Sequence, residues 1–303
     1  KNYTDYTRDE TYLTGKGIDV LVETSRYWVS RATYNPPKDV YMILGVTGPN
    51  EYENNVNNNW YTNRMVQWSL RYTADTLEMM RVRYPELYES AVGRLDLSRS
   101  EVESFVNISR KMYLPEDKKL GIFLQQDGFL DKEQRLVSEL APEDLPIGRK
   151  WSWDRVLRSC FIKQADVLQG LWFLNDQFSR EEKIRNFDFY EPRTVHESSL
   201  SPCVHSILAA EIGREDKAYE LYLRTARLDL DNYNKDTDDG LHITSMAGTW
   251  MSIVNGFGGM RIKDGCLCLA PFKPGTWEGY SFRLVFRGRL LKVTVDGLGT
   301  TLL

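Results

Sequence analysis

Glu51 is the first residue in the sequence whose type and surroundings are suited to acid–base chemistry. In the stretch GVTGPNEYENNVNNNWYTNRM it follows a Thr-Gly-Pro turn and precedes a run of asparagines. Any of Asn57, Asn58 and Asn59 could cap the next helix, so the loop could hold the Glu51 carboxyl at a fixed angle. A carboxyl held in a partly apolar setting is suited to general acid catalysis. On these residues alone, an ordinary charged loop residue is an equally good interpretation.

A second group of polar side chains interrupts the apolar stretch FIKQADVL. Lys163 and Gln164 together present several hydrogen-bond donors, and such donors suit the hydroxyl groups of a sugar. A buried ion pair between Lys163 and Asp166 would explain the same residues nearly as well. The stretch therefore predicts a carbohydrate contact, with structural pairing as the alternative.

The stretch EPRTVHESSLSP carries a histidine and a glutamate just before a predicted helix. Ser198 or Ser199 could be the N-cap of that helix, which leaves His196 and Glu197 unexplained. We expect these two residues to contact and orient the catalytic side chains without touching the substrate themselves. His205, inside the helix, is expected to be a hydrogen-bonded core residue.

The stretch DGLHITSMAGTW brings an imidazole, hydroxyl groups and small residues to the start of the last predicted helix. The dipole and the free amides of a helix N-terminus favour negative charge, so His242, Ser245, Gly248 and Thr249 predict an anion site. The same small residues would also permit close helix packing. The motifs G-x-x-x-x-G-K-[ST], G-x-G-x-x-G and H-E-x-x-H are absent, which argues against nucleotide and zinc-protease chemistry.

Apolar periodicity predicts a mainly helical protein that positions these four stretches in loops. The Ser98/Glu101 and Ser179/Glu182 pairs have capping-box spacing and mark two of the helix starts. Almost no strand-like alternation is found before residue 256. The helices are expected over 15–33, 60–83, 99–112, 152–174, 180–185, 199–212, 215–229 and 245–256.

The pattern changes at the FGGM junction, residues 257–260. From Cys266 onward apolar and polar residues alternate, with turns at Pro-Gly and Arg-Gly, which is typical of antiparallel strands. We therefore expect a helical domain over 1–258 and part of a small β domain over 259–303.

Composition narrows the class of protein. The 303 residues are 42% hydrophobic with a formal net charge of -4, and no basic stripe is present, so nucleic acid is not an expected partner. No apolar run reaches the length of a membrane span, and we expect a cytoplasmic location. The four scattered cysteines predict no disulfide framework. The Lys-Asn-Tyr start suggests an internal segment of a longer polypeptide.

Taken in order, GPNEY, NNxYTN, IKQADV, VHESSLSP and GLHITSMAGTW resemble glycoside hydrolase family 65, the inverting disaccharide phosphorylases. The resemblance covers nearly the whole chain. It implies an (α/α)6 barrel, present here as its C-terminal portion, followed by a small antiparallel β-sandwich domain. It also implies reversible phosphorolysis of an α-linked glucose disaccharide with inorganic phosphate as co-substrate, no metal or organic cofactor, and a homodimer.

The resemblance also assigns roles to single residues. Glu51 would be the general acid, and Lys163 and Gln164 would hold the glucosyl unit. The phosphate loop would contain His242, Ser245, Gly248 and Thr249. Asn50 stands where many members carry aspartate, and the family's glucose-binding Trp-Asp pair has no match in this chain.

Substrate choice is the least determined part of the resemblance. The stretch 45–65 favours maltose, while kojibiose, nigerose and trehalose are alternatives within the family. A hydrolase would need a second carboxylate as base, and Glu197 is the candidate for it. A helical-repeat binding protein would leave Glu51, Lys163 and His242 unexplained.

Overall fold

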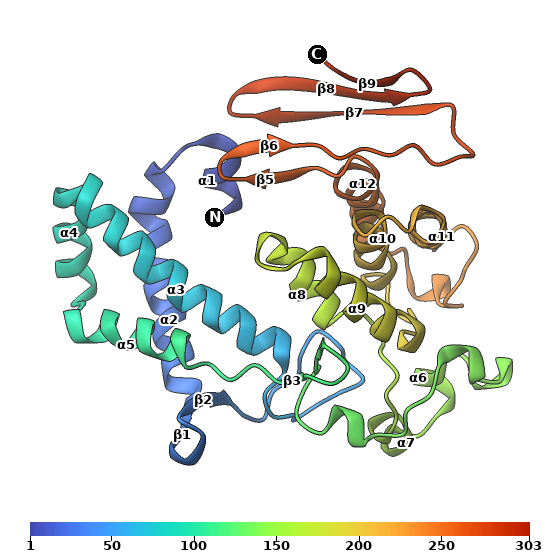
Figure 1. Ribbon diagram of the computed structural model, residues 1–303, viewed down its shortest axis with the longest axis horizontal. Helices are drawn as coiled ribbons and strands as arrows, with labels where there is room; N and C mark the ends of the chain where they lie inside the picture. Colours follow the sequence, from blue (N-terminus) through green and yellow to red (C-terminus); the bar gives the residue numbers. More distant parts are fainter. The chain divides into compact units, whose positions relative to one another are not determined.

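The structure is a computed structural model that describes residues 1–303 (Figure 1). Its internal contacts divide the chain into two compact units. Unit 1 contains Lys1–Val46, Asn55–Pro115 and Gln125–Asp127, and unit 2 contains Thr47–Asn54, Glu116–Leu124 and Gly128–Leu303. The loop Thr47–Asn54, which contains the predicted acid Glu51 and is called the acid loop, therefore belongs to unit 2, although the residues on either side of it belong to unit 1.

Unit 1 is built mainly from five α-helices. Helix α3 begins where the asparagine run ends: the Asn59 side chain accepts a hydrogen bond from the Thr62 amide at 2.9 Å, so Asn59 is the N-cap. Apolar clusters join α2 to α3 and α4, and α3 to α5. The helices are α1 (Asn2–Thr7), α2 (Ile18–Arg31), α3 (Trp60–Arg83), α4 (Pro85–Leu95) and α5 (Arg99–Arg110).

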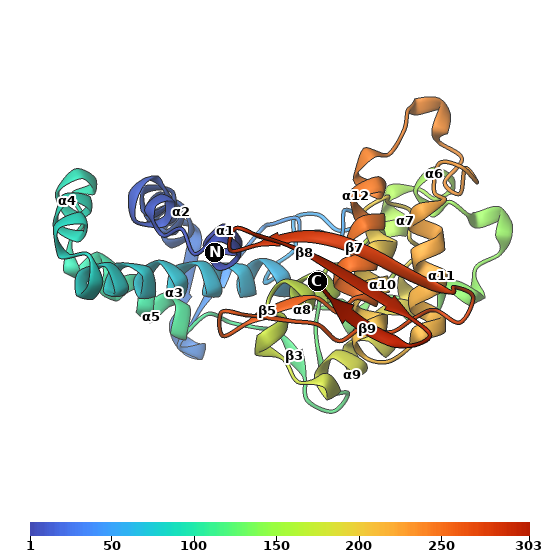
Figure 2. The same ribbon diagram turned by 90° about the horizontal axis from the view of Figure 1, so that it is seen from above.

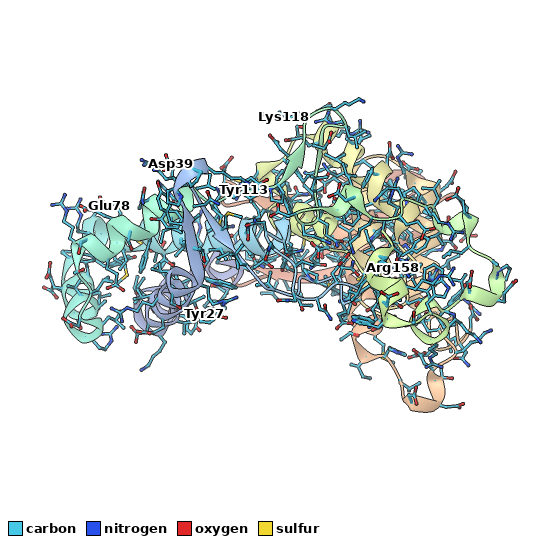
Figure 3. The ribbon with its side chains drawn as sticks, turned by 90° about the horizontal axis from the view of Figure 1, so that it is seen from below. Tyr27, Asp39, Glu78, Tyr113, Lys118 and Arg158 are labelled. Atoms are coloured by element: carbon cyan, nitrogen blue, oxygen red, sulfur yellow. The ribbon has the colours of Figure 1, made fainter.

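Unit 1 also contains a hairpin that the periodicity did not predict. Strands β1 (Ala32–Asn35) and β2 (Val40–Ile43) pair antiparallel, so reading the lack of alternation before residue 256 as an all-α region is wrong. The strands are four residues each, too short to produce a clear alternation. The turn depends on Asp39, which has a φ of 52° and lies at the tip of the hairpin (Figure 3).

Unit 2 contains the remaining helices, with α10 at its centre. Residues 201–209 of α10 are all buried, and α11 and α12 lie beside it (Figure 2). The Ser179/Glu182 capping box at α9 is confirmed. The helices are α6 (Ile147–Lys150), α7 (Trp153–Arg158), α8 (Val167–Phe173), α9 (Arg180–Tyr190), α10 (Ser201–Glu211), α11 (Glu215–Ala226) and α12 (Ile243–Met251), and a short hairpin joins β3 (Glu116–Asp117) to β4 (Ile122–Phe123).

The helix predicted over 152–174 is wrong in its middle. The chain forms α7, then leaves helical structure over residues 159–166, and resumes as α8. The polar residues that interrupt the apolar pattern, Lys163 and Gln164, lie in this irregular stretch. The Ser159 amide already bonds the Val156 carbonyl three residues back, which ends α7 with a tight turn.

The C-terminal residues form antiparallel strands, as the alternation predicts. Arg287 and Gly288, with φ values of 53° and 75°, make the hairpin turn between β7 and β8. At the junction, Gly259 has a φ of 57°, and a Cβ there would lie 2.5 Å from the Ala270 carbonyl oxygen, so only glycine fits. The strands are β5 (Arg261–Lys263), β6 (Cys266–Cys268), β7 (Gly279–Phe286), β8 (Arg289–Asp296) and β9 (Gly299–Leu302).

The mainly helical prediction is confirmed, with small antiparallel sheets added to it. All four cysteines are free thiols. None of the helices combines the length and the apolar character needed to span a bilayer.

Candidate active site

Three segments of unit 2 meet around the predicted acid. They are the loop Thr47–Asn54, the irregular stretch 159–166 between α7 and α8, and the stretch 193–199 that precedes α10. All three are loops, whose backbone groups must find partners outside regular structure. Side chains of the loops themselves supply many of these partners.

A short parallel bridge aligns the second and third segments. The Ile162 amide donates to the Arg193 carbonyl at 3.0 Å, and the Ile162 carbonyl accepts from the Val195 amide at 2.9 Å. Lys163 therefore follows the bridge on one segment and His196 follows it on the other.

Asn50 joins the acid loop to the second segment. Its side chain is 0% exposed, and its Oδ1 accepts from the Lys163 amide at 2.9 Å and from the Tyr52 amide at 3.2 Å. The Asn50 amide donates to Asp166 Oδ2 at 3.2 Å. An aspartate at position 50 would offer the same acceptor, so asparagine can keep this arrangement.

The predicted acid itself lies outside this buried framework. The Glu51 side chain is 56% exposed, which corrects the expectation of a partly apolar setting. Its carboxylate forms an ion pair with Lys163 Nζ, whose side chain is 29% exposed. The sequence-predicted pair of acid and sugar-binding lysine is thus brought into direct contact.

The Gln164 side chain is buried and bonds to the acid loop. Its Nε2 donates to the Pro49 carbonyl at 2.6 Å, and the residue is 8% exposed. One donor of the side chain is therefore engaged with the acid loop, and its predicted contact with the glucosyl unit stays a prediction.

Tyr52 and Glu197 form a contact that sequence reasoning did not anticipate. The Tyr52 hydroxyl donates to Glu197 Oε2, and the Glu197 carboxylate also accepts the Ile147 amide at 2.6 Å and the Gly148 amide at 3.1 Å. Burial, and then the Glu197 carboxylate, raise the pKa of Tyr52 above its ordinary value, so the hydroxyl keeps its proton. Glu197 thereby holds the start of α6 and the residue next to Glu51.

Glu53 is a second acid of the loop, and its role is structural. It is 4% exposed and forms an ion pair with Lys132 Nζ at 2.5 Å. Lys132 Nζ also donates to the Leu157 carbonyl at 2.5 Å. The ion pair thus ties the acid loop to Lys132 and, through it, to the Leu157 carbonyl, so Glu53 anchors the loop.

Behind Glu197 lies a buried cluster of two histidines and a glutamate. Glu191 Oε2 bonds His196 Nε2 at 3.2 Å and His205 Nδ1 at 2.6 Å, while Glu191 Oε1 pairs with Lys217 Nζ at 2.9 Å. His196 Nδ1 is bonded to Ser201 Oγ at 2.7 Å. His205, 0% exposed, is a core residue that is hydrogen-bonded through Nδ1, while its buried Nε2 has no partner.

The charges of this cluster follow from its burial. Burial lowers the pKa of His196 to about 4, so its ring is neutral at pH 7. Burial opposes ionisation of Glu191, but the hydrogen bonds from His196 and His205 outweigh it and hold the pKa of Glu191 well below the ordinary range. These three side chains have the donor atoms of a metal site. They already bond one another directly, which explains their clustering without an ion.

The serines of the third segment do not cap α10. Leu200 is the N-cap of α10 and makes no side-chain capping bond, so the predicted serine cap is wrong. Ser198 Oγ instead accepts from the Leu200 amide at 3.2 Å. Ser199 Oγ lies 3.1 Å from Thr244 Oγ1, so this segment contacts both the acid loop, through Glu197, and the start of α12.

His242 is the N-cap residue of α12. Its Nδ1 lies 2.7 Å from Asp229 Oδ1, its amide donates to Asp229 Oδ2 at 2.8 Å, and its Nε2 lies 3.5 Å from Asp236 Oδ2. Hydrogen bonds from His242 lower the pKa of Asp229. The imidazole is therefore oriented by two carboxylates.

The other predicted phosphate residues take part in helix packing. Ser245 Oγ donates to the Thr225 carbonyl at 2.6 Å, and Thr249 Oγ1 donates to the Ser245 carbonyl at 2.9 Å. A Cβ on Gly248 would lie 2.9 Å from the Cys203 Cβ, so α12 approaches α10 closely there. The close-packing alternative thus describes Ser245 and Gly248 in this structure, and their binding of phosphate stays a prediction.

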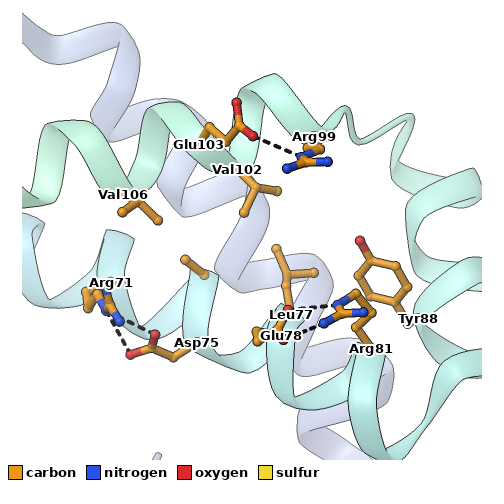
Figure 4. A pocket seen from close by; sticks show the side chains of 11 residues that line it. Arg71, Asp75, Leu77, Glu78, Arg81, Tyr88, Arg99, Val102, Glu103 and Val106 are labelled. Atoms are coloured by element: carbon orange, nitrogen blue, oxygen red, sulfur yellow. Dashed lines mark hydrogen bonds and ion pairs between the residues drawn. The ribbon is translucent and has the colours of Figure 1, made fainter.

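A pocket of about 690 Å³ lies elsewhere, in unit 1, on helices α3, α4 and α5 (Figure 4). Its apolar floor includes Leu77 and Val102. Its arginines are paired within their own helices, Arg71 with Asp75, Arg81 with Glu78 and Arg99 with Glu103. None of the predicted site residues lines it, so its size alone does not make it the catalytic site.

Comparison with known proteins gives two family matches. The glycosyl hydrolase family 65 central catalytic domain matches residues 1–251, and the glycosyl hydrolase family 65 C-terminal domain matches residues 260–302.

Individual relatives agree with these matches. Maltose phosphorylase of Bacillus subtilis (strain 168) is 56% identical over 297 residues, which is 97% of this chain and 38% of the relative. Alpha,alpha-trehalose phosphorylase of Thermoanaerobacter brockii is 40% identical, and kojibiose phosphorylase of Halothermothrix orenii is 36% identical, each over 97% of this chain and 38% of the relative.

Among solved structures, a putative kojibiose phosphorylase from human microbiome has a TM-score of 0.89 at 37% identity. The alignment covers 97% of this chain and 40% of that one. The chain thus spans about two fifths of the length of the proteins that it matches.

Proposed function

Because the chain belongs to glycosyl hydrolase family 65, we propose that it carries the proton donor and the phosphate loop of an inverting disaccharide phosphorylase acting on maltose. The identity of 56% to a maltose phosphorylase, against 40% and 36% to trehalose and kojibiose phosphorylases, supports maltose as the substrate. Kojibiose, nigerose and trehalose are the alternatives.

The observation that carries the proposal is the contrast between the carboxylates around the acid loop. Glu51 is exposed on a loop whose neighbours are fixed, whereas Glu197 accepts three hydrogen bonds and Glu53 is buried in an ion pair. An inverting hydrolase needs a second carboxylate that is available to activate water. A phosphorylase does not, because phosphate arrives as an anionic nucleophile.

The proposed reaction is a single displacement. Glu51 gives its proton to the glycosidic oxygen as the bond from that oxygen to C1 breaks, and a phosphate oxygen forms the new bond to C1 from the opposite face. The products are β-glucose 1-phosphate and glucose. Lys163 and Gln164 hold the glucosyl unit, and the loop of His242, Ser245, Gly248 and Thr249 holds phosphate through the N-terminus of α12.

The wider architecture is part of the proposal. Residues 1–258 are a portion of an (α/α)6 barrel, and residues 259–303 are part of a β-sandwich domain. The two family matches, at 1–251 and 260–302, support this division. The protein uses no metal or organic cofactor, and it is a cytoplasmic homodimer.

The test uses the protein at the full length that its gene encodes. Maltose is supplied with and without inorganic phosphate, and glucose and β-glucose 1-phosphate are measured. A phosphorylase releases glucose only with phosphate, a hydrolase releases it without, and a binding protein releases none. Synthesis from β-glucose 1-phosphate with glucose as acceptor, followed by identification of the linkage, separates maltose from the other disaccharides.

A further inference from the structure

We infer that Glu197 is a positioning residue for the proton donor Glu51 and that it acts through the Tyr52 hydroxyl. The inference rests on the proposed function and adds to it a role for two residues outside the predicted reacting set. It starts from their place in the chain: Tyr52 is covalently next to Glu51, and Glu197 comes from the segment before α10.

Glu197 is a fixed point. Its Oε1 accepts the Ile147 amide at 2.6 Å and its Oε2 accepts the Gly148 amide at 3.1 Å, so both oxygens are bonded to the backbone at the start of α6. Hydrogen bonds to an ionised carboxylate are among the stronger ones in proteins. The Tyr52 hydroxyl, which donates to Oε2, is thereby tied to backbone rather than to a mobile side chain.

Tyr52 has little freedom of its own. The residue is 5% exposed and belongs to an apolar cluster with Ile147, Trp151 and Phe161. A Cβ added to Gly148 would collide with the Tyr52 hydroxyl oxygen, so position 148 must stay glycine for the ring to lie there. The ring cannot move without breaking this packing, and the backbone of Glu51 moves with it.

Exposure explains why the acid needs such a support. Glu51 is itself 56% exposed and contacts Lys163, a flexible partner that the proposal assigns to the sugar. A partly exposed ion pair holds a side chain weakly. The fixed geometry of the proton donor must therefore come from the residues on either side of it, and Asn50 and Tyr52 are those residues.

The expected consequence concerns proton transfer and leaves sugar binding nearly intact. A proton donor displaced by about 1 Å can slow the reaction about 100-fold. The loss should appear only where the leaving group needs a proton. Maltose needs one, because a sugar alkoxide leaves poorly. α-Glucosyl fluoride does not, since fluoride departs as a stable anion while phosphate attacks C1.

The test compares these two substrates in the full-length protein. Tyr52→Phe removes one hydroxyl, and Glu197→Gln removes the charge while keeping the size. With maltose and phosphate, each is expected to lower kcat by about 10- to 100-fold, with KM within about 3-fold of wild type. With α-glucosyl fluoride and phosphate, kcat is expected to stay within about 3-fold. The double variant is expected to match Glu197→Gln alone, because the two residues act in series.

A matched control is Tyr280→Phe, which removes a half-buried hydroxyl that donates to the Phe272 carbonyl at 3.0 Å in the C-terminal strands. It is expected to leave kcat with maltose unchanged. Equal losses on both substrates, or an unchanged kcat with maltose in Tyr52→Phe, would overturn the inference. A wild-type protein without phosphate-dependent activity would instead refute the proposed function.

Discussion

The acid loop and the 242–249 segment differ in whether their predicted catalytic or binding residues also make the structural contacts. In the loop, the predicted catalytic side chain, Glu51, is exposed while Asn50 and Tyr52 beside it are buried and bonded. In the 242–249 segment, the predicted ligands themselves make the packing contacts, as Ser245 and Gly248 do against neighbouring helices.

This difference teaches where mutations should separate activity from stability. A side chain with few structural contacts can be changed with little effect on folding, whereas one that also fills a helix interface cannot. In the acid loop, loss of turnover and loss of stability should therefore fall on different residues. In the 242–249 segment they should fall on the same ones.

The largest effect is expected for Glu51→Gln. Loss of the proton donor should lower kcat for maltose phosphorolysis by about 100- to 10,000-fold, because this is the range that general acid catalysis supplies. The melting temperature should fall by no more than about 4 °C, since a partly exposed ion pair such as that with Lys163 contributes about 1 kcal/mol or less. Activity with α-glucosyl fluoride should survive. A large fall in melting temperature would break the proposed separation between catalytic and structural residues.

The next largest effect is expected on the pH dependence of stability and concerns His196. This residue belongs to the stretch 193–199, which contacts both the acid loop and the start of α12. Its pKa of about 4 is below the ordinary 6.5, so the unfolded chain binds a proton more readily than the folded one. Its contribution is therefore complete above pH 6.5 and is lost as pH falls towards 4. A shift of this size corresponds to roughly 3 kcal/mol.

The variant His196→Asn tests this linkage, because asparagine tolerates the left-handed conformation (φ 54°) found at position 196. The free energy of unfolding, measured by urea between pH 6.5 and 4, should depend less steeply on pH in the variant than in wild type. Equal slopes would show that another group causes the acid sensitivity.

Gly248→Ala tests whether Gly248 is needed for the packing of α12 against α10 or for contact with phosphate. The added Cβ would press on Cys203, and overpacking of this kind costs about 1 to 3 kcal/mol. We expect a lower urea midpoint together with a higher KM for phosphate. The control is Gly93→Ala in α4, where nothing lies within 4 Å of the new Cβ and stability should be unchanged or higher. Weaker phosphate binding at full stability would mean that Gly248 touches the ligand instead.

The smallest effect is expected for Ser245→Ala. Loss of its hydrogen bond to the Thr225 carbonyl should cost about 1 kcal/mol of unfolding free energy. KM for phosphate should rise by less than about 10-fold, because the hydroxyl affects phosphate only through the position of the start of α12. Initial rates measured against phosphate concentration give KM, and urea unfolding of the same preparation gives the stability, so the two changes are compared directly. A rise in KM above about 10-fold with unchanged stability would place the hydroxyl on phosphate.

Helix positions were predictable where a local signal marked them. Asn59 begins α3 and Ser179 with Glu182 begins α9, because each cap bonds amides within three residues of itself. The β1–β2 hairpin and the break over 159–166 were missed. The hairpin strands are four residues each, too short to show a clear alternation. The break depends on a partner distant in sequence, the Arg193 carbonyl that accepts from the Ile162 amide.

Sequence by itself determined the family, the helical class and the four stretches that contain the predicted site residues, because motif order and apolar period are properties of the chain. Only the tertiary structure decided that Glu51 contacts Lys163, that Glu197 bonds Tyr52, and that Ser199 reaches Thr244. These contacts join residues 112, 145 and 45 positions apart. No local preference encodes such pairs, since packing of the whole unit brings the loops together.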